Sequence, residues 1–457
     1  MKKYNFIIIS ALVIISFITS CRKEEPLNVD FNTYNVDNPI AKTPLDDWLI
    51  ATFLDEYNID VIYRYNRFFH GEDRDIAAVK VEKVRPQMQT VLEGFILPYR
   101  KVAGVPFIKR MVPKQFVLFG SGSYNPDNSY VLATAAAGRN ITIYDLNNFD
   151  LSSPNDVVGK LRTIHHEFTH TLNQIVPMPE DFQLITKSTY LATWTSTSAA
   201  TARANGYVTP YASSQPGEDF AETVSHLLVN GQAWFDAWAN GSTAEGKAAL
   251  KAKEASVVQY FSNMGIDFRA IQQEVQNVAR NTYQYQNVSF RYWMGQNLFK
   301  GMTINLDSDP VYTNSGISEE YKTVYNQLKS GIAGLPYGLR LNFIKLNFTS
   351  TTAMNLEINF SQGTGTYLAR YAFNTDLNTT NGETKFTTGT AGGTGADWVG
   401  NADLIKPGVQ PMLDYLLDHT FVAEWLPTNI NPDNYNKYGG FYVLGAPNNY
   451  FYGQLAQ

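Results

Sequence analysis

The residues of this 457-residue chain best suited to chemistry lie in one short run, His166-Glu167-Phe168-Thr169-His170. On a helix, positions four residues apart face the same side, so His166 and His170 could bind one metal ion together. Imidazole ligands in a tetrahedral site with one open position suit Zn²⁺, which is the cofactor we expect. Glu167 would then take a proton from a water molecule that the metal activates for attack on a carbonyl group.

The surrounding sequence predicts a helix that positions this pair. Ser153 can act as N-cap, Pro154 suits the first helical position, and Asp156 follows the cap at capping-box spacing. At 100° per residue, His165 falls beside the apolar arc opposite the metal pair and is predicted to be a packed core residue. The apolar residues of that arc are Val157, Leu161, Ile164, Phe168, Leu172 and Ile175.

A third ligand is needed, because the five-residue pattern alone occurs by chance in many helices. Residues 217–230 predict a second helix, with Glu218 and Glu222 one turn apart on one side and Asn230-Gly231 ending it. His226 could approach the same side, where it would orient an oxyanion or hydrogen-bond Glu222. Two carboxylates one turn apart cannot easily flank a sugar bond, which argues against a retaining glycosidase.

These two helices resemble those of gluzincin-type zinc peptidases. The resemblance implies that Glu218 is the third metal ligand and that Glu222 orients a ligand histidine, although the reverse order stays open. Tyr211 stands seven residues before Glu218, a spacing similar to that in the protease domain of anthrax lethal factor. This likeness implies that the Tyr211 hydroxyl stabilises the oxyanion, with Tyr207 as the alternative.

The N-terminus predicts an exported lipoprotein. Residues 1–20 have two lysines and then a mostly apolar run, which is typical of an export signal; an uncleaved anchor helix is the alternative. Ile18-Thr19-Ser20-Cys21 resembles a bacterial lipobox, which implies lipidation at Cys21. Because Cys21 is the only cysteine, no intramolecular disulfide can form. The following Arg22-Lys23-Glu24-Glu25 resembles the surface-export tag of Bacteroidota-type lipoproteins. It implies an outer membrane lipoprotein exposed on the cell surface rather than facing the periplasm.

Composition and texture set the expected organisation. The chain has 36 basic and 42 acidic residues, a net charge of −6, which becomes −8 when residues 1–20 and their two lysines are removed. Nucleic acid is therefore excluded as a partner, and we expect membrane contact only through the lipid. The predicted class is α+β: a signal peptide (1–20), a lipidated tether (21–44), a zinc metallopeptidase domain (45–286) and a β-rich accessory domain (287–457).

Periodicity predicts the elements of both domains. In the first we expect helices at 43–56, 85–97, 243–264 and 268–282, and strands at 60–66, 116–119, 130–134 and 138–146. Residues 140–144 are the predicted edge strand that pairs with an extended substrate. In the second, strands at 339–347, 353–360 and 367–373 predict an antiparallel sheet or sandwich, with helices at 318–329 and 409–417. His70 and His419 lack partners at ligand spacing and are predicted to be surface or structural residues.

In order, the lipobox, an aromatic-rich segment, HHEFTHTLNQ from His165 and EDFAE from Glu218 resemble the substrate import-associated zinc metallohydrolase lipoproteins. The likeness covers roughly residues 21–285 and implies a gluzincin-like fold and a role in breaking down or handling material for uptake. It does not identify a substrate; we expect a peptide or glycopeptide. The implied partners are a TonB-dependent importer and its nutrient-binding lipoprotein. The other hypothesis is a non-catalytic surface module that binds glycan or peptide and retains its zinc. Three ligands with a general-base glutamate favour the enzyme, because structural zinc sites are usually closed by four.

Overall fold

The computed structural model describes residues 41–457, apart from 72, 125–129, 137–138 and 433. The predicted signal peptide, Cys21 and almost all of the tether lie outside the described residues. Helix α2 (Pro44–Leu49) begins one residue after the predicted start at Thr43, whose N–H donates to Asp46 Oδ2 at 2.8 Å. Residues Leu49–Gln457 form one compact unit of mixed helix and strand content, which confirms the expected α+β class. Within the described part of the chain, no helix combines the length and apolar character that crossing a membrane requires.

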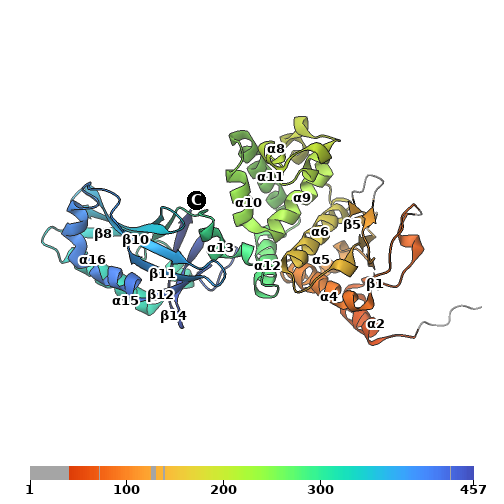
Figure 1. Ribbon diagram of the computed structural model, residues 1–457, viewed down its shortest axis with the longest axis horizontal. Coiled ribbons are helices and arrows are strands. Elements are labelled where there is room, and N and C mark those ends of the chain that lie inside the picture. Colours follow the sequence, from red (N-terminus) through yellow and green to blue (C-terminus); the bar gives the residue numbers. More distant parts are fainter. Residues whose placement is uncertain (1–40, 72, 125–129, 137–138, 433) are drawn as a thin grey trace, which may run out of the picture. The chain divides into compact units, whose positions relative to one another are not determined.

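A four-stranded sheet stands beside the helix that carries the histidine pair (Figure 1). Its order is β1 (Asp60–Ile62), β2 (Gln115–Leu118), β6 (Asn140–Ile143) and β5 (Ala133–Ala136); the first three are parallel, and β5 is antiparallel to β6. The prediction that residues 140–144 form an edge strand is therefore wrong, because β6 is paired on both sides and β5 is the edge. Alternating apolar residues report burial and not which strands are neighbours.

The helices before β2 differ from the prediction at both prolines. Helix α4 (Val81–Val91) contains Pro86 instead of starting there, and it continues through the π-helical turn η3 (Leu92–Ile96) into α5 (Leu97–Met111). Pro98 directly follows this π-helical turn and does not stop the helix, so the prediction that it ends the helix is wrong. The remaining short elements here are α3 (Asp55–Tyr57), η1 (Ile50–Leu54), η2 (Arg67–Phe69), β3 (Ser123–Tyr124), β4 (Tyr130–Val131) and η4 (Leu146–Asn148).

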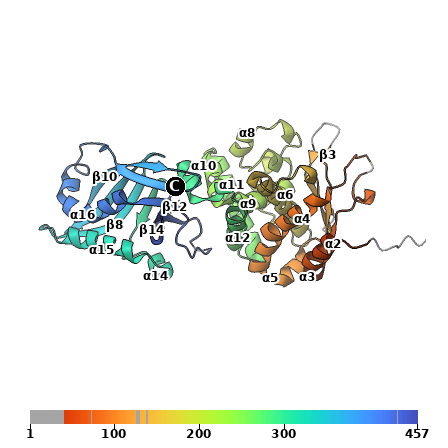
Figure 2. The ribbon, with the colours of Figure 1, turned by 60° about the horizontal axis from the view of Figure 1, so that its bottom comes forward.

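Helix α6 (Pro154–Asn173) carries the HExxH residues and packs against α9 (Pro216–Val229), as Figures 1 and 2 show. Ser153 Oγ accepts a hydrogen bond from Asp156 N at 3.3 Å, which confirms the predicted N-cap. The predicted apolar arc of α6 is buried except for Ile175, which lies beyond the end of the helix and is 45% exposed.

Further helices surround α9. They are α7 (Phe182–Ile185), α8 (Ala199–Ala204), α10 (Gly231–Asn240), α11 (Ala244–Asn263) and α12 (Phe268–Asn281), with the 3-10 turns η5 (Lys187–Thr189), η6 (Trp194–Ser196) and η7 (Tyr211–Ser214) between α7 and α9. The bounds of α11 and α12 confirm the helices predicted at 243–264 and 268–282. Asn230 caps α9 as predicted, and α10 begins at Gly231, whose φ of +91° suits glycine.

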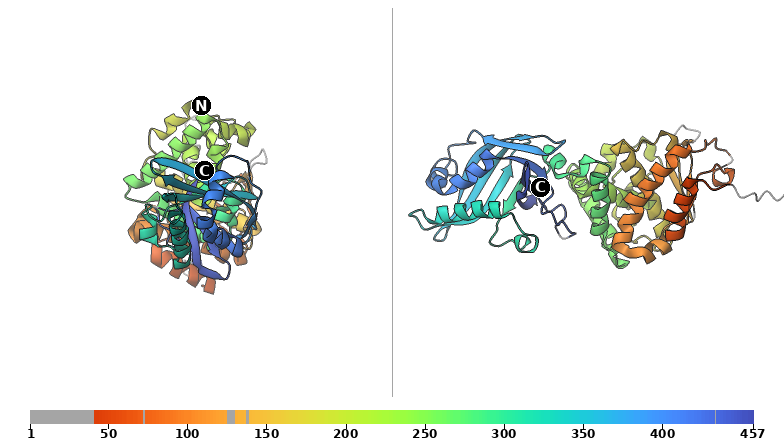
Figure 3. Two further views of the ribbon diagram at one scale, coloured as in Figure 1. Left: turned by 90° about the vertical axis from the view of Figure 1, so that its left-hand side faces the viewer. Right: turned by 90° about the horizontal axis from the view of Figure 1, so that it is seen from below.

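The C-terminal part is a closed barrel of antiparallel strands (Figure 3). The described strands are β7 (Gly301–Ile304), β8 (Leu339–Phe348), β9 (Ala353–Gln362), β10 (Gly365–Leu377), β11 (Glu383–Thr388), β12 (Thr420–Glu424), β13 (Tyr438–Val443) and β14 (Ala446–Ala456). The predicted strands and the antiparallel sheet are confirmed. The sheet is not part of a sandwich but closes into a barrel, because β14 pairs with β7.

Helices complete the barrel region. They are η8 (Gln286–Val288), α13 (Phe290–Gly295), α14 (Val311–Ser315), α15 (Glu319–Ala333) and α16 (Gly400–Asp418). Helix α15 confirms the helix predicted at 318–329, whereas α16 is longer than the predicted 409–417 and contains Pro407 and Pro411. Buried phenylalanines fill the core, among them Phe386, Phe421, Phe441 and Phe451.

Candidate metal centre

Three side-chain atoms from α6 and α9 converge on one point. His166 Nε2 lies 3.1 Å from His170 Nε2 and 3.0 Å from Glu218 Oε2, and His170 Nε2 lies 3.1 Å from the same oxygen. Three lone-pair donors this close repel one another unless a proton or a cation lies between them. Two imidazole nitrogens and one carboxylate oxygen are also a donor set that zinc accepts in catalytic sites, so these residues fit a zinc ion.

The electrostatics of the site favour positive charge at the same point. Burial lowers the pKa of His166, but hydrogen bonds to Glu218 and Glu222 outweigh burial and raise it to about 10. Burial raises the pKa of Glu218, but its contacts with the two histidines more than reverse that effect. The pKa of this carboxyl is therefore well below its usual range. A metal ion would replace the proton that His166 Nε2 otherwise attracts.

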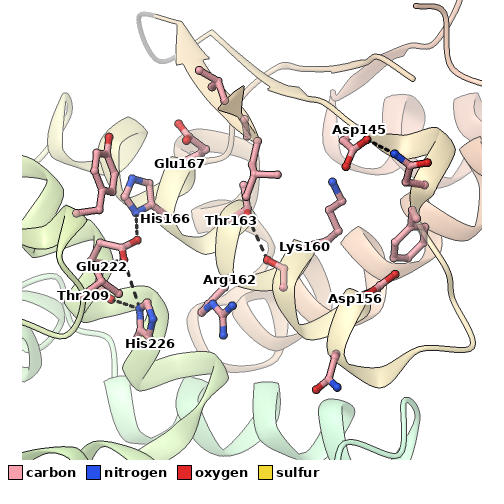
Figure 4. A pocket seen from close by; sticks show the side chains of 18 of the residues that line it. Asp145, Asp156, Lys160, Arg162, Thr163, His166, Glu167, Thr209, Glu222 and His226 are labelled. Atoms are coloured by element: carbon pink, nitrogen blue, oxygen red, sulfur yellow. Dashed lines mark hydrogen bonds and ion pairs between the residues drawn. The ribbon is translucent and has the colours of Figure 1, made fainter. Parts of the chain in front are cut away.

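Glu222 lies on the opposite side of the His166 ring from Glu218. Its Oε1 is 2.8 Å from His166 Nδ1, and its Oε2 accepts a hydrogen bond from Thr209 Oγ1 at 2.7 Å (Figure 4). A proton on Nδ1 directed at Glu222 leaves Nε2 free to bind a metal. Glu218 therefore lies at the point where the two Nε2 atoms converge, and Glu222 lies behind the His166 ring.

His226 contributes less than its position in the sequence suggested. Its Nδ1 is 2.9 Å from the backbone oxygen of Glu222 and 3.9 Å from Glu222 Oε2, and its ring packs on Trp234 at 5.2 Å. Burial lowers its pKa to about 4, so the ring is neutral near pH 7. His226 thus borders the cavity as an uncharged neighbour of Glu222.

Glu167 and Tyr211 flank the metal point. Glu167 is 9% exposed, accepts a hydrogen bond from the Ala135 N–H of β5, and has its pKa raised mainly by burial. The Tyr211 hydroxyl donates to Glu218, and its ring stacks on His166 with centroids 5.9 Å apart. Burial, followed by the charge of Glu218, raises the pKa of Tyr211, so its hydroxyl keeps its proton at neutral pH.

The alternative tyrosine and the other histidines lie outside the site. Tyr207 is fully buried, and its hydroxyl donates to Thr186 O at 3.1 Å, so it cannot assist an oxyanion. His165 is a core residue as predicted, 0% exposed and 3.2 Å from Gly94 O. His70 contacts the Tyr65 hydroxyl, and His419 contacts Tyr415 O, in keeping with structural roles.

A cavity of about 720 Å³ opens from the metal centre along one face of α6 (Figure 4). Its lining includes His166, Glu167 and Tyr211 at one end and Asp145, Asn148, Asp156 and Lys160 from the first half of α6 and the loop after β6. Residues Val131, Leu132 and Ala133 form its border on the β5 side. The metal centre therefore lies at one end of an elongated cavity large enough for several residues of a peptide.

Sequence reasoning missed three residues of the site. Thr209 holds Glu222, Gln215 Nε2 donates to Glu218 Oε1 at 3.2 Å, and Trp194 packs edge-on against Tyr211 at 4.9 Å. Their one signal was proximity in the chain, because all three precede α9 within 25 residues of Glu218. Hydroxyl, amide and indole groups in a loop carry no spacing rule comparable to that of the two histidines.

One family model matches more than half of this chain. The model of the family described as "putative zinc-binding metallo-peptidase" matches residues 38–269, and this range contains every residue of the metal centre. A crystal structure of a protein with the same description, from Bacteroides caccae ATCC 43185, is 26% identical. The similarity covers 52% of this chain and 92% of that chain, with a TM-score of 0.45. No curated protein matches.

Proposed function

The chain belongs to this family of zinc-binding metallo-peptidases, and from that premise we propose that it is a zinc-dependent hydrolase that cleaves peptide or glycopeptide amide bonds. His166, His170 and Glu218 would hold the ion. The observation that carries the proposal is the convergence of these three residues beside the buried Glu167, at the end of an elongated cavity. A structural zinc site would need neither a neighbouring base nor room for a substrate.

Glu167 and Tyr211 supply the proton and hydrogen-bond chemistry. Zinc, when bound there, polarises a carbonyl group and makes a water molecule more acidic. Glu167 accepts the proton of the attacking water and passes it to the leaving amine; its raised pKa suits both transfers. Tyr211 is protonated, and its hydroxyl would turn from Glu218 to donate its one hydrogen bond to the oxygen on which negative charge develops.

Among the described residues, the edge of β5 that faces away from β6 has no strand partner, and it offers a binding surface for the substrate backbone. Leu132 O accepts from Tyr144 N at 3.0 Å, so the backbone groups of Leu132 and Thr134 face β6, and those of Ala133 and Ala135 face outward. Ala135 N–H already contacts Glu167 on this outer side. A peptide added as a further strand would therefore pass directly over the metal centre.

The gluzincin type and the cellular setting belong to the same proposal. The order of His166, Glu167, His170, Glu218 and Glu222 supports the gluzincin assignment. The likeness of residues 18–25 to a lipobox and an export tag supports an outer membrane lipoprotein, exposed on the surface beside a TonB-dependent importer and its nutrient-binding lipoprotein. Cys21→Ser would test this setting: the variant should no longer sediment with outer membranes, and unchanged sedimentation would contradict lipid anchoring.

The test of the enzyme combines metal content with hydrolysis of a mixed peptide library, read by mass spectrometry. Glu167→Gln should keep about one zinc per chain and lose hydrolysis by roughly 10²–10⁴-fold, since only proton transfer is removed. His170→Ala should lose both zinc and hydrolysis. Chelation should abolish cleavage by the native protein, and added zinc should restore it.

Glu180→Gln is the matched control, because this exposed glutamate lies outside the cavity. It should behave like the native protein in both measurements. A native protein that binds zinc and cuts no peptide in the library would refute the enzyme and support the non-catalytic binding module.

A further inference from the structure

A lysine projects into the cavity beyond the metal centre. Lys160 lies on α6, and its Nζ donates to Tyr144 O at 2.8 Å. Within the described part of the chain, no carboxylate lies within 4.0 Å of this ammonium. Burial lowers its pKa, against the opposing charges of Asp145 and Asp156. Lys160 is thus a partly buried cation with two donors left for a ligand.

The other charged groups along the cavity already have partners or face solvent. Asp145 Oδ1 accepts from Asn148 Nδ2 at 2.7 Å, and Asp156 is exposed in the first turn of α6. Arg162 Nη1 donates to Asn230 Oδ1 at 3.1 Å, and Figure 4 shows its side chain directed away from Lys160. At this end of the cavity, Lys160 is therefore the cation best placed to meet an incoming anion.

The spacing on α6 relates Lys160 to the reacting bond. Lys160 precedes Glu167 by seven residues, two helical turns, so both lie on one side of α6, about 10 Å apart along its axis. An extended peptide advances about 3.3 Å per residue. A bond placed beside Glu167 would therefore lie two or three peptide residues from Lys160.

The direction of β5 says which end of the peptide reaches Lys160. Ala135 N–H contacts Glu167, whereas Leu132 accepts from Tyr144, whose own carbonyl accepts from Lys160. Strand β5 therefore runs from the Lys160 end of the cavity toward Glu167. A peptide paired antiparallel to β5, the commoner pairing, would run the opposite way and bring its C-terminal side to Lys160.

We propose that Lys160 binds a substrate carboxylate two or three residues on the C-terminal side of the cleaved bond. The terminal carboxylate of a short peptide and an aspartate or glutamate side chain at that position share this chemistry. The inference rests on the proposed peptidase function and adds its substrate class: acidic or C-terminal segments of peptides. An ammonium with an incomplete set of acceptors binds carboxylate through charge-assisted hydrogen bonds.

The experiment measures binding without turnover, in zinc-loaded Glu167→Gln. The probe is a randomised pool of pentapeptides, prepared once with free C-terminal acids and once as C-terminal amides, and retained peptides are identified by mass spectrometry. Acids should be retained roughly tenfold to a hundredfold better than amides if the terminal carboxylate is the ligand. Enrichment of Glu over Gln within the amide pool would instead identify a side-chain carboxylate.

Adding Lys160→Met to the Glu167→Gln protein should abolish either preference without changing the zinc content. Adding Lys160→Arg instead should leave the preference intact. Lys187→Met, which removes an exposed lysine outside the cavity, should leave it unchanged. Absence of both preferences, or a preference that survives Lys160→Met, would overturn the proposal. A Lys160-dependent preference in a protein whose native form cuts nothing would instead reject the peptidase and retain the carboxylate site.

Discussion

Thr209 Oγ1 donates a hydrogen bond to Glu222 Oε2 at 2.7 Å, while the other oxygen of the same carboxylate lies 2.8 Å from His166 Nδ1. Thr209 Oγ1 in turn accepts from Ala212 N at 3.0 Å. One carboxylate therefore connects the loop that carries Tyr211 to the ring of His166 in the candidate metal centre. This arrangement orients the ring and keeps a proton on Nδ1, away from the metal point.

Weakening this connection should lower zinc affinity. We expect Glu222→Gln to reduce it by roughly 10–100-fold and Thr209→Val by less, because the valine leaves the Glu222 contact with His166 in place. Competition with a chromophoric chelator measures both. Thr323→Val is the control and should bind zinc like the native protein, because this exposed hydroxyl of α15 donates only to Glu319 O within the same helix. Native affinity in Glu222→Gln would show that His166 needs no orienting partner.

A buried ion pair joins α9, the helix that carries Glu218 and Glu222, to α11. Lys253 Nζ of α11 lies 2.7 Å from Asp219 Oδ2 of α9, both side chains are fully buried, and Nζ also donates to Gly206 O at 2.7 Å. Lys253→Met should cost roughly 3–5 kcal/mol of unfolding free energy, because it leaves the Asp219 charge without its partner. Urea unfolding measures the loss.

The double variant Lys253→Met with Asp219→Leu distinguishes a lost partner from lost packing. Removing both charges should cost clearly less than the two single changes added together. Additive losses would show that the two residues act independently.

Close packing at Gly94 should make this position intolerant of a side chain. A Cβ built there would lie 2.4 Å from Leu161 Cδ2 of α6, so Gly94→Ala should cost roughly 1–3 kcal/mol of stability. Gly159→Ala is the matched control on α6: nothing lies within 4 Å of its Cβ, and the helix should gain up to about 1 kcal/mol. Thermal unfolding measures both variants. An unchanged unfolding temperature for Gly94→Ala would contradict the proposed steric conflict with Leu161.

Glu254 should make stability depend on acid pH. Its carboxylate meets Lys251 Nζ at 2.8 Å and also pairs with Arg269 Nη2. Burial raises its pKa, but Arg269 and Lys251 outweigh burial and leave it below the ordinary value of 4.5. A depressed carboxyl pKa stabilises the fold above pH 4.5, and this contribution is lost as pH falls through the folded value.

Glu254→Gln should therefore lose roughly 2–3 kcal/mol at pH 7, and the difference from the native protein should shrink below pH 4.5. Urea unfolding at several pH values measures this. Glu245→Gln, an exposed change on the same helix, should show no such difference. If the two proteins differed in unfolding free energy by the same amount at every pH, the charge of Glu254 would not be the source of its stabilising effect.

Local features of the site were predictable from the sequence because they follow from chain geometry alone. Ser153 and the apolar arc set the start and the buried face of α6, and a rotation of 100° per residue put His166 and His170 on one side. The same argument placed Glu218 and Glu222 on one side of α9. The alternating residues of β8 and β9 likewise revealed their strands.

The meeting of those faces depended on the tertiary structure. The packing of α6 against α9 decided that Glu218 reaches both histidines while Glu222 lies behind His166. It also placed Thr209, which lies in a loop without a recognisable motif, in contact with Glu222. The order of β6 and β5, the closure of β14 on β7, and the position of Lys160 in the cavity also emerged only there. Periodicity reports which side of an element is buried, whereas these contacts join residues whose separation along the chain carries no information about their distance in space.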